Sequence, residues 1–418
     1  MAEASLSEQD IALLRADTPG IANRIHFNNA GAGLAPRPVL EAVKDHLDLE
    51  AETGGYEARD QANDAYSAFY ANIAALIGAR SHEIAYVENA TRAWDMAFYA
   101  IDFRPGDRVI TGRAEYVSNY VALLQMKEKA GIEIDLIEDD AHGQIDLSAL
   151  KAAITPRTRL IALTHVPTFG GLINPAEDVG EIARQRGVLY LLDACQSVGQ
   201  LPLNVSHIGC HMLSATGRKF LRGPRGTGFL YVSETVLDQL TPPFVDLEST
   251  RWIDAHTYAL RQDAKRFENW ERFVAGQIGL GLAASYAIGW GIGRLSKRIC
   301  DLGAILRTEL ASQRGIDVHD KGLGKCGIVT FCVKGEAPEA TLHRLQAHAI
   351  NVSVSNASSA RIDLPQRGLS ALVRASVHAY NTDAEVEAFM HAVLDTAKPA
   401  RGQSLSKRDD PGSIQNAV

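Results

Sequence analysis

One lysine stands in surroundings that a surface lysine does not need. Lys219 lies in the stretch SATGRKFLRGPRGTG, between a small polar turn and a loop with three closely spaced glycines. A lysine acts as a nucleophile when its pKa is lowered, and partial burial and neighbouring cations lower it. Arg218 and Arg222 are such neighbours in the sequence. These features make Lys219 a candidate for covalent catalysis.

A carboxylate upstream of Lys219 has the position of a binding residue. The apolar run VLYLL ends abruptly in Asp193, and Gln196 follows three residues later. In open α/β sheets, ligands bind at the carboxyl ends of the strands, so a carboxylate there points into a site. An aspartate at such a place is equally suited to cap the element that follows. Both interpretations of Asp193 fit the sequence by itself.

A third candidate is a helix start at EIAYVENATRAWDMAFYAI, which has the pattern of a strand followed at once by a helix. The first turn of this helix contains Ala90 and Thr91. The free N–H groups and the positive end of the helix dipole make such a turn an anion site. The alternative is that Asn89 caps a helix with a purely structural role.

Two nucleotide-binding motifs are excluded. ATGRKF does not match the P-loop pattern, because the bulky Phe220 follows Lys219 where a serine or threonine is required. The segment GLGLAA from Gly279 lies inside a helical pattern and lacks the complete GxGxxG fingerprint. We expect its small residues to allow close helix packing.

The elements that position these residues alternate along the chain. Short apolar runs, EIAYVEN, DRVITG, IEIDLIE, RLIALTHV, VLYLLDA and GFLYVS, are typical of buried strands, and several are separated by segments long enough for a crossover helix. This predicts an α/β fold with a doubly wound, mostly parallel sheet and a smaller α+β C-terminal domain. The predicted divisions are an arm at 1–20, a large domain at 21–280, a small domain at 281–398 that takes in part of the N-terminal segment, and a disordered tail at 399–418.

Composition narrows the range of partners. The 418 residues include 42 Lys+Arg and 50 Asp+Glu, a net charge of −8 without a basic cluster, so nucleic acid and membranes are not expected partners. The N-terminus lacks the pattern of a signal peptide, which predicts a soluble, cytoplasmic protein. The five cysteines form no CxxC pair, so we expect reduced thiols and no metal site.

An acid for a pyridine nitrogen, a lysine for an aldehyde and a helix start for a phosphate are what pyridoxal 5'-phosphate (PLP) requires. Together the residues resemble the class V aminotransferase family of PLP-dependent fold-type I enzymes. This family includes cysteine desulfurases, C–S lyases of the selenocysteine-lyase kind, kynureninase and isopenicillin-N-epimerase-like proteins. The resemblance extends from HFNNAGAGLAPRPV to VRASVHAYNTDAEVEAF, and LLDACQSVGQ with SATGRKFLRGPRGTG is its most specific part.

The resemblance implies a role for each matching residue. Lys219 would bind PLP covalently, Asp193 would face its ring nitrogen, and Gln196 would lie near its phenolic oxygen. The phosphate would be held by four residues: Ala90, Thr91, Thr216 and Arg218. Arg218 stands where relatives often carry histidine, and it still supplies a cation.

Tyr116, in RAEYVSN, matches the position at which desulfurases place a histidine over the cofactor ring. A tyrosine can stack equally well but carries protons poorly near pH 7. The alternative for Tyr116 is a core or interface aromatic residue. Thr168 stands where relatives place an asparagine beside the cofactor.

The same resemblance implies a substrate pocket and a dimer. Arg374, in LVRASVHAYN, matches the arginine that receives the substrate carboxylate, and Asn28 and Asn29 match residues that line the pocket. In the family the cofactor site lies at the interface of a homodimer, whose partner subunit lends a hydroxyl to the phosphate. Thr250, in DLESTRW, is the candidate for that hydroxyl, and an ordinary exposed loop residue is the alternative.

One absence bears on the reaction. Cysteine desulfurases carry a mobile cysteine just before the arginine segment, and the stretch at 351–376 contains serines and no cysteine. We therefore expect an enzyme on a small α-amino acid with transaminase-type chemistry, and persulfide formation is disfavoured. A β-eliminating C–S lyase acting on a cysteine-derived substrate is the alternative, with an amino-acid epimerase third.

Overall fold

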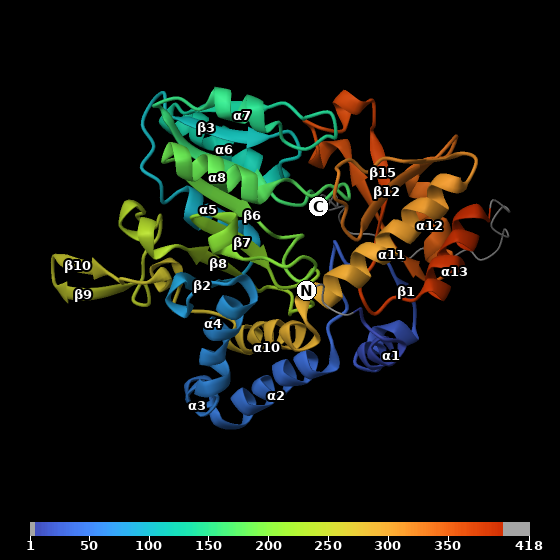
Figure 1. The fold of residues 1–418 in the computed structure, drawn as a ribbon. Coiled ribbons are helices and arrows are strands. Elements are labelled where there is room, and N and C mark those ends of the chain that lie inside the picture. The colour runs from blue at the N-terminus through green and yellow to red at the C-terminus, as the bar shows by residue number, and fades with distance from the viewer. Residues whose placement is uncertain (1–4, 396–418) are drawn as a thin grey trace, which may run out of the picture.

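The computed structural model describes residues 5–395, so the predicted tail at 399–418 lies outside the described residues (Figure 1). A central sheet of seven strands has the order β2-β8-β7-β6-β5-β3-β4. Its strands are β2 (Ile84–Val87), β3 (Arg108–Gly112), β4 (Glu133–Ile137), β5 (Thr158–Thr164), β6 (Leu189–Asp193), β7 (Met212–Thr216) and β8 (Gly228–Val232). β8 is antiparallel to both of its neighbours, and the other pairs are parallel. The predicted mostly parallel α/β sheet is confirmed.

Helices bury both faces of the central sheet. Along β6, Tyr190 and Leu192 join one core cluster, whereas Leu191 points to the other face and joins a second. This two-sided burial explains why the strands are continuous apolar runs. The helices around the sheet are α4 (Asn63–Ile77), α5 (Ala90–Phe98), α6 (Val117–Ala130), α7 (Leu147–Ala153), α8 (Ala176–Arg186), α9 (Val205–Ile208) and α10 (Val274–Trp290).

The glycines of α10 allow the close helix packing that was expected from GLGLAA. A Cβ atom on Gly281 would lie 2.8 Å from the Cα atom of Phe69 in α4. A Cβ atom on Gly279 would lie 2.6 Å from Val43 in α2 (Arg37–Thr53). The chain before these helices forms α1 (Glu8–Ala16), and α3 (Gly55–Gln61) follows α2.

A second, four-stranded sheet lies beside the first (Figure 1). Its order is β11-β12-β15-β14, with all pairs antiparallel. The elements of this part are α11 (Ile292–Ser312), β11 (Ile316–Val318), β12 (Ile328–Val333), α12 (Pro338–Ala347), β13 (Ile350–Asn351), β14 (Ser353–Asn356), β15 (Ala371–Ser376) and α13 (Asp383–Leu394). The N-terminal strand β1 (Ile25–His26) pairs in parallel with β13, so an N-terminal segment lies beside the C-terminal part.

The structure differs from the expected elements in three places. β7 is a full strand of the central sheet, although its sequence MLSAT contains two polar residues. The segment after 246, for which no strand was predicted from the sequence, forms a hairpin of β9 (Thr250–Asp254) and β10 (Thr257–Leu260), which projects from the body (Figure 1). The expected division at 280/281 falls inside α10, and the chain turns at Gly291, between α10 and α11. Within residues 5–395, no helix is long and apolar enough to cross a membrane.

Candidate active site

Lys219 lies in a tight turn after β7 and is 7% exposed. The N-terminal loop packs against this turn, because the Gly33 N–H donates to the Arg218 carbonyl at 2.7 Å. Arg222, with a φ of 61°, holds the other side of the turn by hydrogen bonds to the Leu34 carbonyl and the Thr18 hydroxyl. Burial lowers the pKa of Lys219, and the positive charges of Arg218 and Arg374 lower it further. The neutral, nucleophilic form of the amine is therefore more populated than in an ordinary surface lysine at the same pH.

Asp193 ends β6 at the carboxyl edge of the sheet and is 4% exposed. Its Oδ1 accepts a hydrogen bond from the Cys195 N–H, and its Oδ2 accepts one from Asn119 Nδ2, both at 2.9 Å. Asp193 also contributes to the electrostatic surroundings of Lys219. The structure thus brings together the acid and the lysine that the sequence singled out.

The helix start with Ala90 and Thr91 lies at the end of β7. Gly228, which begins β8, pairs with Thr216 at the end of β7, and a Cβ atom on Gly228 would lie 2.9 Å from the carbonyl carbon of Asn89. The glycine therefore lets the N-terminus of α5 approach the sheet. The Asn89 side chain accepts the Arg92 N–H, which leaves the N–H groups of Ala90 and Thr91 without a partner in the helix.

Two further residues from the list of phosphate contacts have partners within the chain. The Thr216 hydroxyl donates to the Thr227 carbonyl at 3.3 Å. Arg218 donates to the Gly31 carbonyl and is half-buried. Burial lowers the pKa of Arg218. Thr250 is distinct from this group, since it begins the projecting hairpin and donates to the Asp246 carbonyl at 2.5 Å.

Tyr116 lies beside the lysine. The Lys219 Nζ atom is 5.9 Å from the centroid of the Tyr116 ring. Burial raises the pKa of Tyr116, so its hydroxyl stays protonated near neutral pH. The aromatic ring therefore lies where a stacking residue over a Lys219-bound ring is required.

Arg374, in β15, enters the same site from the second sheet. It donates to both the carbonyl and the hydroxyl of Thr168, at 2.9 and 2.7 Å, and to Asn28 Oδ1 at 3.3 Å. Its Nε atom is buried without a partner among the described residues. Burial and the charge of Arg218 lower the pKa of Arg374 to about 10, which leaves it charged at neutral pH. Arg374 is thus a buried cation with a free donor.

Gln196 and Asn29 complete the predicted set. Gln196 Nε2 donates to the Thr168 hydroxyl and to the Ala30 carbonyl, both at 3.0 Å, and its buried Oε1 has no partner among the described residues. The amide of Asn29 is fully used by His26, Ser376 and Tyr380. Of the two asparagines, Asn28 is the one that contacts Arg374.

The residues present fit PLP. A buried lysine, a carboxylate at a strand end and a free helix start are arranged around one region, and two buried polar atoms there, Gln196 Oε1 and Arg374 Nε, have no partner in the described chain. Buried polar atoms are normally hydrogen-bonded, so unpartnered ones at one site indicate a bound polar group. The site can therefore hold both an anionic cofactor and a substrate carboxylate.

Sequence reasoning missed two site residues, Glu115 and Asn119. Asn119 Nδ2 bridges Asp193 and Glu115, which is buried just before α6. Both residues flank Tyr116 in RAEYVSN, and their spacing of four is the only signal in the sequence. This spacing cannot be interpreted from the sequence, because the contacts of Glu115 and Asn119 come from the ends of β3, β5 and β6, which meet only in the folded sheet.

Fold and site together define a PLP-dependent enzyme of fold type I. The family model for aminotransferase class-V matches residues 25–389, and the chain belongs to this family, as the resemblance implied.

Curated relatives match the chain over most of its length. A "Probable cysteine desulfurase" of Methanothermobacter thermautotrophicus is 28% identical over 90% of this chain and 95% of that protein. Another of the same name, from Xylella fastidiosa strain Temecula1, is 30% identical over 92% of this chain and 95% of that protein. Among solved structures, the apo cysteine desulfurase from Thermococcus onnurineus NA1 has a TM-score of 0.86 at 28% identity, covering 94% of this chain and 98% of that one.

The reaction expected from the sequence is wrong. Transaminase-type chemistry was expected, with a C–S lyase and an epimerase as alternatives and persulfide-forming desulfuration disfavoured. The curated relatives matched over most of their length are named probable cysteine desulfurases, and the solved structure at 28% identity is named a cysteine desulfurase. The missing cysteine at 351–376 removes one possible sulfur acceptor, but it leaves the groups around Lys219 unchanged. It was therefore insufficient to exclude desulfuration.

Proposed function

We propose that the protein is a cysteine desulfurase, which uses PLP to remove sulfur from L-cysteine. The observation that carries the proposal is the meeting of Lys219, Asp193 and Arg374 at one buried site. The curated relatives that share the fold are named for this activity. When bound, PLP supplies an electron sink for bonds at the Cα atom of an amino acid.

The two residues nearest the chemistry have different roles in this proposal. The Lys219 amine would hold the cofactor through its aldehyde, and the same amine, when free, would move the proton at the substrate Cα atom. Burial supports this role, because it lowers the pKa of Lys219. Asp193 would hold a proton on the ring nitrogen by charge and hydrogen bonding.

Arg374 orients the substrate. Its guanidinium lies between Thr168 and Asn28, and its unpartnered Nε supports a hydrogen bond to the substrate carboxylate. Once Arg374 holds the substrate carboxylate, the remaining pocket residues determine where the cysteine side chain points.

The sulfur needs an acceptor. One cysteine and two thiols give alanine, hydrogen sulfide and one disulfide, because the carbon keeps the electrons of the C–S bond and takes a proton while the thiols are oxidised. Cys195 is the thiol that influences Lys219, but burial raises its pKa and holds it protonated. Because the thiolate is the nucleophile in such a transfer, we propose that the acceptor is a thiol from solution.

Sulfide release tests this function. The PLP-loaded protein is incubated with L-cysteine and dithiothreitol, and sulfide is measured with time. The wild type should release sulfide over many turnovers, and Lys219→Ala should release none. Lys265→Ala is the matched control, because Lys265 also lies over an aromatic ring, that of Tyr70, but belongs to no part of this site. An inactive wild type that carries PLP would refute the proposed function.

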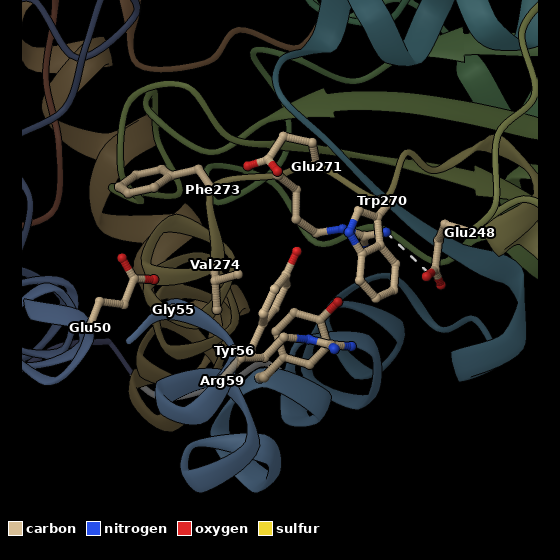
Figure 2. A pocket seen from close by; sticks show the side chains of 11 residues that line it. Glu50, Gly55, Tyr56, Arg59, Glu248, Trp270, Glu271, Phe273 and Val274 are labelled. Atoms are coloured by element: carbon tan, nitrogen blue, oxygen red, sulfur yellow. Dashed lines mark ion pairs between the residues drawn. The ribbon is translucent and has the colours of Figure 1, made fainter. Parts of the chain in front are cut away.

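We further propose a homodimer formed through a surface that we call the hairpin surface. Its members are large apolar side chains that are 43–78% exposed: Phe244, Val245, Leu247, Trp252, Ile253 and Tyr258. Contiguous exposed apolar groups of this size mark interaction sites. A pocket of about 320 Å³ is lined by Glu248, the residue after Leu247 of this surface, and Figure 2 shows Tyr56, Arg59 and Trp270 gathered at the pocket. Thr250 lies on the same hairpin, which supports its proposed contact with the phosphate of a partner subunit.

Light scattering tests the dimer. Trp252→Glu should shift the mass of the PLP-bound protein from dimer toward monomer. Leu323→Glu is the control, because Leu323 is 69% exposed but lies outside the hairpin surface. A monomeric wild type would contradict the proposal.

A further inference from the structure

Glu115 is a buried carboxylate that has no role in the reaction proposed above. It is 5% exposed, and none of the ion pairs among the described residues involves it. Burying an ionised carboxylate is costly unless hydrogen bonds replace its water. Its position just before α6 therefore needs a physical explanation.

Four donors from three elements converge on Glu115. Its Oε1 accepts from Asn119 Nδ2 at 2.9 Å, from the Tyr116 N–H at 2.8 Å and from the Thr164 hydroxyl. Its Oε2 accepts from the Thr111 hydroxyl at 2.8 Å. Thr111 lies in β3 and Thr164 ends β5, so the carboxylate is fixed where two parallel strands end. This arrangement satisfies a carboxylate without a cation.

Asn119 links this carboxylate to Asp193. The same Nδ2 atom lies 2.9 Å from Glu115 Oε1 and 2.9 Å from Asp193 Oδ2, so its two hydrogens serve two carboxylates. Both partners only accept when ionised, which fixes the orientation of the amide. Asn119 is 2% exposed, so no water competes for these hydrogens.

Two carboxylates that share one amide also repel each other. Burial raises the pKa of Glu115, and the charge of Asp193 raises it further, whereas the hydrogen bonds from Thr164 and Asn119 lower it. A positive charge placed on the far side of Asp193 would relieve that repulsion. A protonated ring nitrogen bound at Asp193 would be such a charge.

We propose that Glu115 and Asn119 are positioning residues that act through Asp193 to keep the ring nitrogen of PLP protonated. Asn119 fixes the Asp193 carboxylate, and Glu115 fixes Asn119 and adds a second negative charge behind it. The inference rests on the proposed role of Asp193 as the partner of the ring nitrogen. In this proposal the proton on the ring nitrogen is supported by three linked side chains, Asp193, Asn119 and Glu115, instead of by Asp193 alone.

The protonation state of the ring nitrogen tests this proposal directly. Wild type, Glu115→Gln and Asn119→Ala are loaded with PLP labelled with ¹⁵N in the ring, and the nitrogen chemical shift is followed against pH. Both variants should lose the nitrogen proton at a pH lower by at least about one unit, a tenfold change in the equilibrium. Affinity of the apo-proteins for PLP, measured by fluorescence, should fall in parallel.

Controls separate a local role from general destabilisation. Glu268 is also a buried carboxylate, held by the Tyr86 N–H, the Tyr70 hydroxyl and Arg272, and it has no link to Asp193. Glu268→Gln should leave the nitrogen shift unchanged even if it lowers the melting temperature. If Glu115→Gln fails to fold, Asn119→Ala carries the test, since it removes the link and retains both carboxylates.

The variant Asp193→Asn separates the proposed role of Asp193 from the inferred roles of Glu115 and Asn119. If Asp193→Asn loses the nitrogen proton but Glu115→Gln and Asn119→Ala titrate as the wild type does, the inference is wrong and the proposed role of Asp193 stands. If Asp193→Asn also titrates as the wild type, the proposed role of Asp193 fails, and the inference fails with it.

Discussion

The Lys219 Nζ atom lies 5.9 Å from the centroid of the Tyr116 ring, so the one lysine of the site faces an aromatic surface. A cofactor ring bound to Lys219 would stack on Tyr116, which contributes about 0.5–1.5 kcal/mol beyond the buried area. Tyr116→Leu should weaken PLP binding by that amount, and Tyr116→Phe should not. Equilibrium titration of the apo-proteins measures both.

The Tyr116 hydroxyl should not set the pH dependence of the reaction. Burial raises the pKa of Tyr116 above its ordinary 10.0, so the neutral phenol persists through that pH and is lost only above it. The rate profile of Tyr116→Phe below about pH 10 should therefore have the same shape as that of the wild type. A limb that disappears in this variant would show that the hydroxyl transfers a proton.

The lowered pKa of Lys219 predicts how PLP attaches to the apo-protein. An ordinary lysine, at 10.5, reaches its neutral form only in strong base, whereas burial moves this transition to lower pH. The attachment rate should therefore rise with pH and level off below 10.5. Nα-acetyl-lysine is the reference amine, and stopped-flow absorbance follows both reactions. Equal profiles for the protein and the reference would contradict the effect of burial.

Gly228 should be required for phosphate binding. A Cβ atom there would lie 2.7 Å from the Ala215 carbonyl oxygen and 2.9 Å from the carbonyl carbon of Asn89, and both are backbone atoms that cannot move freely. Gly228→Ala should displace the start of α5 and lower PLP affinity at least about tenfold, because a charge-assisted hydrogen bond contributes about 1.5–3 kcal/mol, which corresponds to roughly 10- to 150-fold. Gly289→Ala, in α10, meets no atom within 4 Å and should leave PLP affinity unchanged.

Arg374 should govern substrate binding rather than cofactor binding. Arg374→Ala removes a charged contact and should lower kcat/KM for L-cysteine by the equivalent of about 1.5–3 kcal/mol. Arg374→Lys keeps the charge but cannot donate from two nitrogens in a plane, so its loss should be intermediate. PLP affinity should be unchanged in both variants, and a wild-type kcat/KM in Arg374→Ala would exclude the carboxylate role.

Much of this architecture could be predicted from local patterns. Strands such as VLYLLDA are apolar on both faces because helices cover both, and that pattern is visible in the sequence. β7 could not be recognised in the same way, because Ser214 and Thr216 are polar and yet 0% and 5% exposed between β6 and β8. The hairpin of β9 and β10 could not be recognised for a different reason. Its residues are mostly exposed, so its sequence lacks the alternation or apolar run of a strand that packs on a core.

Site residues could be predicted only where their immediate neighbours in the sequence pointed to a function. Lys219 and Asp193 stand out by their neighbours in the sequence. Glu115 does not, because its donors Thr111 and Thr164 come from strands 53 residues apart and meet only in the folded sheet. The reaction depends on what happens to the substrate sulfur, and the absence of one cysteine was too little to decide it.

If the protein is a cysteine desulfurase, as proposed, the carbon skeleton of the substrate leaves as alanine. The most direct measurement is the product ratio when PLP-loaded protein turns over L-cysteine with dithiothreitol, followed by amino-acid analysis and a pyruvate assay. A cysteine desulfurase should form one alanine for each sulfide released, over many turnovers and with no pyruvate. Pyruvate and ammonia in step with sulfide, without alanine, would contradict it.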